Sequence, residues 1–161
     1  MKKYLIILLL FFSGCTPEQD VTFKPELKVF EGRALTFFNE LNDYRESIGL
    51  KRLIGEKTIT GGCVTHAGWM NDHGASHDGF YNRSILTPAT YFGEVISVGY
   101  NTAESQISAY QNSISHFSAL INPNYTHIGI AQVGEFQCVN LAGYSGNHKS
   151  VVTEQEILIK K

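Results

Sequence analysis

Histidine is the residue type in this chain that most readily does chemistry near neutral pH. The sequence contains six histidines, and a neutral imidazole can bind zinc or copper or move protons as a general acid or base. His66, His73 and His77 have the spacing i, i+7 and i+11, which would place three imidazoles on one face of a continuous helix. Gly74 and Gly79 interrupt that stretch, so neither the continuing helix nor a three-histidine metal site is expected.

Three cysteines offer a different chemistry, and the first of them lies in an export signal. Residues 1–3 form a short basic start and residues 4–12 are all apolar, which is typical of a signal segment and too short to span a bilayer permanently. Ser13-Gly14-Cys15 then resembles the lipobox of bacterial lipoproteins, in which the cysteine is acylated. We predict removal of residues 1–14, lipidation at Cys15 and a tether over residues 15–26.

The other two cysteines, Cys63 and Cys138, have two interpretations. An exported protein folds in an oxidising compartment, where two remaining cysteines can form a disulfide. Closing so long a loop would stabilise the fold by roughly 4–5 kcal/mol. The alternative is a pair of buried free thiols, and no local signature supports Cys63 as a nucleophile. The sequence leaves both interpretations open, and we predict the disulfide for the exported protein.

Composition limits the chain to one domain and argues against a nucleic-acid binder. The chain has 161 residues, of which 43 % are hydrophobic and 12 % aromatic, enough for one core. Charged residues make up 17 % and the formal net charge is −2, so the chain lacks the basic excess typical of nucleic-acid binding. We assign residues 27–146 to the domain and residues 147–161 to a C-terminal tail.

Hydrophobic periodicity predicts helices packed on a small antiparallel sheet. Apolar residues recur at helical spacing over residues 30–48, 62–73 and 101–121, and Asn101 with Glu104 matches a reciprocal N-cap pair for the last helix. Residues 92–98, 126–133 and 136–144 are typical of strands, and Gly134-Glu135 joins the last two as a hairpin turn. Residues 74–91 predict a long loop. Together the elements indicate an α+β fold.

Several short motifs occur in an order that resembles the CAP superfamily, which includes cysteine-rich secretory proteins, venom allergens and plant pathogenesis-related proteins. The resemblance covers about residues 27–146 and is strongest to the compact bacterial branch. It rests on these fragments, in chain order: Leu41-Asn42-x-Tyr44-Arg45 with Gly49-Leu50, His66-Ala67, Ser76-His77, Gly93-Glu94, Tyr110-x-x-Ser113 with His116, and Asn122-Pro123-x-Tyr125-Thr126-x-Ile128-Gly129.

The resemblance implies an α-β-α sandwich, in which helices flank a small antiparallel sheet, with a cleft that carries two histidines and an acidic residue. The matching positions are His77, Glu94 and His116. The asparagine that follows the glutamate in the family is Val95 here, and the second acid of eukaryotic members, expected near Ser113, is absent. A metal in such a cleft would be a weakly held zinc or copper ion with His77 and His116 as ligands, and no cofactor is required.

Three functions are compatible with these residues. The first is a non-enzymatic envelope module that binds a small apolar, lipid or peptide ligand, or a protein partner, in the cleft. The second is a metal-assisted hydrolase or peptidase that uses His77, Glu94 and His116, although no Ser-His-Asp or His-Glu-x-x-His motif supports it. The third is a structural or interaction lipoprotein with a vestigial cleft. In each case we expect a location in a bacterial envelope, periplasmic or surface-exposed, with the lipid on Cys15 as the membrane contact.

Overall fold

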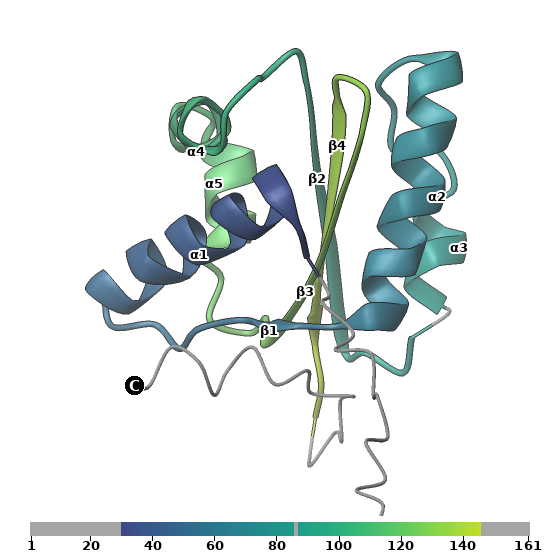
Figure 1. Cartoon of the computed structure of the whole chain (residues 1–161). Helices are drawn as coiled ribbons and strands as arrows, with labels where there is room; N and C mark the ends of the chain where they lie inside the picture. Colours follow the sequence, from purple (N-terminus) through teal and green to yellow (C-terminus); the bar gives the residue numbers. More distant parts are fainter. Residues whose placement is uncertain (1–29, 86, 146–161) are drawn as a thin grey trace, which may run out of the picture.

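The fold is a three-layer arrangement with a sheet between two groups of helices (Figure 1). This computed structural model describes residues 30–85 and 87–145. The predicted signal segment, the lipidation site at Cys15, the tether and the C-terminal tail lie outside the described residues. The predicted α+β class and α-β-α sandwich are confirmed.

The central sheet has four strands in the order β1-β3-β4-β2. These strands are β1 (Ile54–Gly55), β2 (Tyr91–Val98), β3 (His127–Val133) and β4 (Phe136–Gly143). Strands β2, β4 and β3 are antiparallel neighbours, whereas the short β1 pairs with β3 in parallel. The sheet is therefore mixed, which differs from the wholly antiparallel sheet expected, because the two-residue β1 had no periodicity to reveal it.

Helices cover both faces of the sheet. On one face lie α1 (Gly32–Ser47), α4 (Ala103–Gln111) and α5 (Ile114–Leu120), and on the other lie α2 (Lys57–His73) and the short α3 (Phe80–Ile85) (Figure 1). The helix α3 falls inside the stretch that was predicted as a loop. Among the described residues, no helix has the length and apolar character needed to cross a membrane.

Alternation along the strands separates the core into two clusters. Val139 and Leu141 of β4 and Val95 of β2 face α1, α4 and α5, where they join the larger cluster with Phe37 and Leu41. The neighbouring Cys138 and Ile96 point to the opposite face and pack with α2. Successive side chains of a strand point to opposite faces, so this register also decides which polar residues can meet on each side.

The single helix predicted over residues 101–121 is two helices in the structure. The helix α4 begins after Thr102, whose side chain accepts a hydrogen bond from the Ser105 main chain in a capping box, so Thr102 and Ser105 take the roles predicted for Asn101 and Glu104. At the break, the side chain of Asn112 donates to the Ser108 carbonyl, 2.9 Å away, and Ser113 is extended. Asparagine and serine side chains compete with the helical backbone in this way.

Cys63 and Cys138 are fully buried free cysteines, so the predicted disulfide is not present in the structure. The Cys63 thiol donates to the Gly129 carbonyl at 3.3 Å, and the Cys138 thiol lies 3.6 Å from Oε2 of Glu94. The two thiols also interact with each other, and this contact together with burial raises the pKa of Cys138 far above its ordinary value. The alternative left open by the sequence, two buried thiols, describes this arrangement.

We expect thiol counting to separate the two interpretations directly. Two free thiols without solvent exposure should not react with an alkylating reagent in the folded protein, because the reagent cannot reach either sulfur. Both should react after denaturation without reductant, as measured by mass spectrometry. A denatured protein that gains two labels at Cys63 and Cys138 only after reduction would contradict the thiol form.

Candidate functional site

Glu94 is the centre of a polar cluster between the sheet and the α2 side of the molecule. It lies in β2 opposite Asn140 of β4, and its side chain is only 1 % exposed. Val95, the next residue, joins the core on the other face, so alternation turns Glu94 toward α2 and α3. A carboxylate buried to this extent needs partners for its charge.

Arg83 and His77 satisfy that requirement. The Arg83 guanidinium donates from Nε to Oε2 of Glu94 at 2.9 Å and from Nη2 to Oε1 at 2.8 Å. Nδ1 of His77 lies 2.9 Å from the same Oε1. The structure thus brings together two of the three expected cleft residues, His77 and Glu94, and adds an arginine that the sequence analysis did not assign. A bidentate arginine–carboxylate ion pair is among the strongest polar contacts in proteins.

His66 is a further member of the cluster that was not assigned as a site residue. It lies in α2, is 3 % exposed, and its Nε2 is 2.8 Å from the Ser76 carbonyl and 3.8 Å from Oε1 of Glu94. Because a carbonyl only accepts, Nε2 carries the proton. A signal was available in the sequence, since His66 falls on the stripe of α2 that holds Cys63 and Met70.

Protonation of His66 should lower stability in mildly acidic solution. Burial lowers the pKa of His66 from its ordinary value of 6.5, against the opposing effects of Ser76 and Glu94. As the pH falls through 6.5, the unfolded chain binds a proton at this position that the folded chain does not, so the free energy of unfolding decreases until the folded-state pKa is passed.

Urea denaturation at pH 7.5 and 5.5 measures this effect. The variant His66→Gln keeps a donor for the Ser76 carbonyl and does not titrate, so it should lose less stability than the wild type over this pH interval. An equal loss in both proteins would contradict the prediction.

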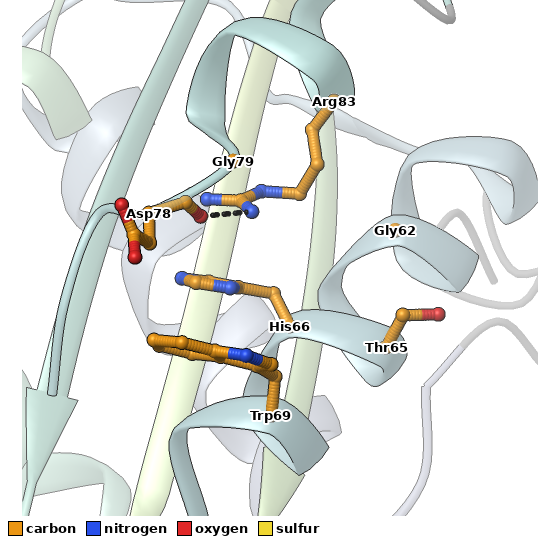
Figure 2. A pocket seen from close by; sticks show the side chains of 7 residues that line it. All are labelled: Gly62, Thr65, His66, Trp69, Asp78, Gly79 and Arg83. Atoms are coloured by element: carbon orange, nitrogen blue, oxygen red, sulfur yellow. Dashed lines mark hydrogen bonds between the residues drawn. The ribbon is translucent and has the colours of Figure 1, made fainter. Parts of the chain in front are cut away.

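A cavity of about 300 Å³ opens beside the cluster, between α2 and the segment that leads into α3. Figure 2 shows Thr65, His66 and Trp69 projecting from α2, with Arg83 facing them from α3. The His66 and Trp69 rings are stacked with centroids 5.8 Å apart. The lining is mainly apolar and consists of Gly62, Thr65, His66, Trp69, Asp78, Gly79 and Arg83.

The structure places His116 away from His77 and Glu94. His116 lies in α5, where Nδ1 is 2.8 Å from the Ser113 hydroxyl and the ring packs on Tyr110. The Tyr110 hydroxyl donates to Gln137, which neighbours Cys138 in β4 and therefore points to the opposite face of the sheet from Glu94. The sheet thus lies between His116 and Glu94. The second histidine near Glu94 is His66 and not His116.

The expected zinc or copper site does not fit the residues as they are arranged. Across residues 30–85 and 87–145, no group of three or more His, Cys, Asp or Glu side chains is placed to hold a metal ion. The two predicted ligands, His77 and His116, face different partners. The oxygens of Glu94 are also already bound by a cation, Arg83.

Comparison with solved structures shows the fold in several bacterial proteins. An extracellular protein with an SCP domain from Bacillus anthracis superposes with a TM-score of 0.66 and 21 % identity over 70 % of this chain and 40 % of that one. A cysteine-rich secretory protein from Staphylococcus aureus gives 0.61 and 15 %, over 68 % of this chain and 38 % of that one. An outer surface protein from Borrelia burgdorferi gives 0.64 and 19 %, and the match covers 69 % of this chain and 92 % of that one.

Sequence comparison agrees with the structural one. Protein YkwD of Bacillus subtilis is 44 % identical over 41 residues, a match that covers 26 % of this chain and 16 % of YkwD. This match therefore spans only a small part of that longer relative. The sequence model of the family described as "CAP: Cysteine-rich secretory protein family" matches residues 38–139, well over half of the chain. The chain belongs to the CAP family of cysteine-rich secretory proteins.

Proposed function

We propose that this protein is a non-enzymatic binding module of the cell envelope, whose cavity between α2 and α3 takes a small, mainly apolar ligand. The observation that carries the proposal is the cavity of about 300 Å³ with its mainly apolar lining. At its edge lies the polar cluster in which Glu94 is hydrogen-bonded to Arg83 and His77. Pockets of this kind, apolar with a few placed polar groups, are typical of ligand sites.

The polar cluster supports binding over hydrolysis. A general base for water activation needs a free lone pair directed at the water. Glu94 is 1 % exposed and accepts from Arg83 and His77, while Nε2 of His66 is directed at the Ser76 carbonyl. Glu94 is therefore held by Arg83 and His77, and His116, the third residue of the hydrolase alternative, lies on the other face of the sheet. We assign the cluster the role of holding the two walls of the cavity together.

The dimensions and chemistry of the cavity indicate the class of ligand. About 300 Å³ is at the lower end of the range for ligand pockets, which suits one aromatic or aliphatic side chain of a peptide or a short acyl chain. Trp69 and His66 offer a flat wall, and Thr65 and Arg83 offer polar atoms at the rim. A peptide or a protein partner could present such a side chain as readily as a free small molecule.

A titration followed by NMR tests the proposal. The probes are N-acetyl amides of single apolar amino acids and fatty acids of short chain length, added to the isotopically labelled protein. At least one probe should shift the amide signals of residues 62–69 and 78–83. The variant Thr65→Phe, which fills the cavity from an exposed position, should weaken that probe at least tenfold.

Val64→Phe provides the matched control. Val64 is next to Thr65 and 52 % exposed but does not line the cavity, so this variant should bind as the wild type does. No shift with any probe, or the same affinity in the Thr65 and Val64 variants, would contradict the proposal. It would favour the remaining alternative, a structural lipoprotein with a vestigial cleft.

We also propose export and anchoring through a lipid on Cys15. The support is the basic and apolar start of the sequence before Ser13-Gly14-Cys15, together with structural relatives described as an extracellular and an outer surface protein. Cells fed a fatty-acid analogue should label the wild type but not Cys15→Ser. Equal labelling of both proteins would contradict the anchor while leaving the ligand proposal untouched.

A further inference from the structure

The carboxylate of Glu94 binds a cation that the chain itself supplies. Both oxygens accept from the Arg83 guanidinium, at 2.8 and 2.9 Å. A third contact, from Nη1 of Arg83 to the Asp78 carbonyl at 2.6 Å, fixes the guanidinium in this place. Figure 2 shows that contact, with the guanidinium drawn next to the His66 ring. The Arg83 side chain is 12 % exposed, so little water competes for it.

Three side chains of the types that bind zinc, His66, His77 and Glu94, lie close together next to Arg83. Nδ1 of His77 is 2.9 Å and Nε2 of His66 is 3.8 Å from Oε1 of Glu94. Two ligands of a tetrahedral zinc ion, with bonds of about 2.05 Å, are separated by about 3.3 Å. The observed separations lie on either side of that value. Two imidazoles and one carboxylate are a ligand set that zinc accepts, with one position left for water.

What the arrangement lacks is a free carboxylate. A divalent ion would have to displace the guanidinium from Glu94 or sit beside it against the repulsion of like charges, which is strong at low solvent exposure. We infer that Arg83 is the resident cation of this site: its guanidinium keeps metal off the latent His66–His77–Glu94 set, and residue 83 decides whether that set binds a divalent ion. This inference holds whether or not the cavity takes an apolar ligand.

Metal binding in the absence of Arg83 would need a change of tautomer at both rings and the loss of the His66 hydrogen bond to Ser76. Nε2 of His66 and Nδ1 of His77 now face the Ser76 carbonyl and Glu94. Each ring would carry its proton on its other nitrogen and turn the freed lone pair to the metal. This step moves each ring proton from one nitrogen to the other and involves no oxidation.

Calorimetric titration of zinc into the full chain tests the inference. The variants are Arg83→Met, which removes the charge and keeps an unbranched chain in place of the arginine stem, and Arg52→Met, which removes one charge at a surface ion pair with Asp43. We expect Arg83→Met to bind zinc at least tenfold more tightly than the wild type and Arg52→Met to match the wild type. The added affinity should disappear in Arg83→Met combined with His66→Ala, His77→Ala or Glu94→Gln, and persist with His116→Ala.

A cobalt titration gives an independent readout, since visible absorption reports coordination by protein nitrogens. Should Arg83→Met fail to fold, Arg83→Gln carries the same test, because its amide still donates to Glu94 without a charge. Two results would overturn the inference: a folded Arg83 variant with no gain in affinity, or a wild type whose zinc binding falls when His77 or Glu94 is replaced.

Discussion

Replacing Arg45 with methionine is expected to lower the free energy of unfolding by about 3–5 kcal/mol. Arg45 lies near the end of α1 and is 1 % exposed, which is unusual for an arginine. Its guanidinium donates to four main-chain carbonyls, at 2.7–3.3 Å, instead of pairing with a carboxylate. These acceptors belong to Lys51, Leu120, Asn122 and Tyr125.

The expected loss of stability follows from the main-chain carbonyls that lose their hydrogen bonds to Arg45. Each buried carbonyl left without a donor costs about 1–3 kcal/mol, and the loss is offset in part because a charge no longer has to be buried. Burial lowers the pKa of Arg45, but an arginine stays protonated in proteins. The side chain thus ties α1 to the segment between α5 and β3, a connection that methionine would not provide.

Urea denaturation monitored by circular dichroism measures the loss. Arg52→Met serves as the control, because Arg52 forms ion pairs with Asp43 and Glu46, whose side chains are each 69 % exposed. Exposed pairs contribute only about 0–1 kcal/mol. If the Arg45 and Arg52 variants lose the same stability, the carbonyl contacts of Arg45 do not have the role assigned to them.

Replacing Gly129 with alanine is the second change expected to have a large effect, about 2–4 kcal/mol of lost stability. A Cβ at this position in β3 would lie 2.5 Å from main-chain atoms of both Ile59 and Thr60 in α2. Neither partner is the end of a flexible side chain, so the helix itself must move away from the sheet. Because α2 carries His66 and Trp69, the cavity should change shape as well.

Gly61→Ala is the matched control for this variant. Gly61 lies in α2, is exposed, and has open space where a Cβ would be placed. Alanine there should stabilise the helix by about 0.5–1 kcal/mol. Thermal unfolding of both variants compares the two expectations. A Gly129→Ala protein as stable as the wild type would show that α2 can shift without cost.

Local patterns predicted most of the elements but not the break in the last helical segment. The long helices and the hairpin at Gly134-Glu135 follow from apolar spacing and from a glycine that adopts φ +57°. The split between α4 and α5 depends on hydrogen bonds of Asn112 and Ser113. A periodicity of apolar residues continues across such a break and does not reveal it.

The sequence by itself determined most of the helices and strands and the family, and the resemblance to that family implied that His77 and Glu94 share one cleft. These conclusions depend on residue type and order, which are written directly in the chain. Only the tertiary structure decided which face of the sheet each side chain meets, because one residue of register moves a side chain to the other face. That register turns Glu94 toward α2 and α3, where His66 and Arg83 meet it. The packing of α5 and α1 on the other face places His116 there and buries Arg45 among carbonyls that lie up to 80 residues away in the chain.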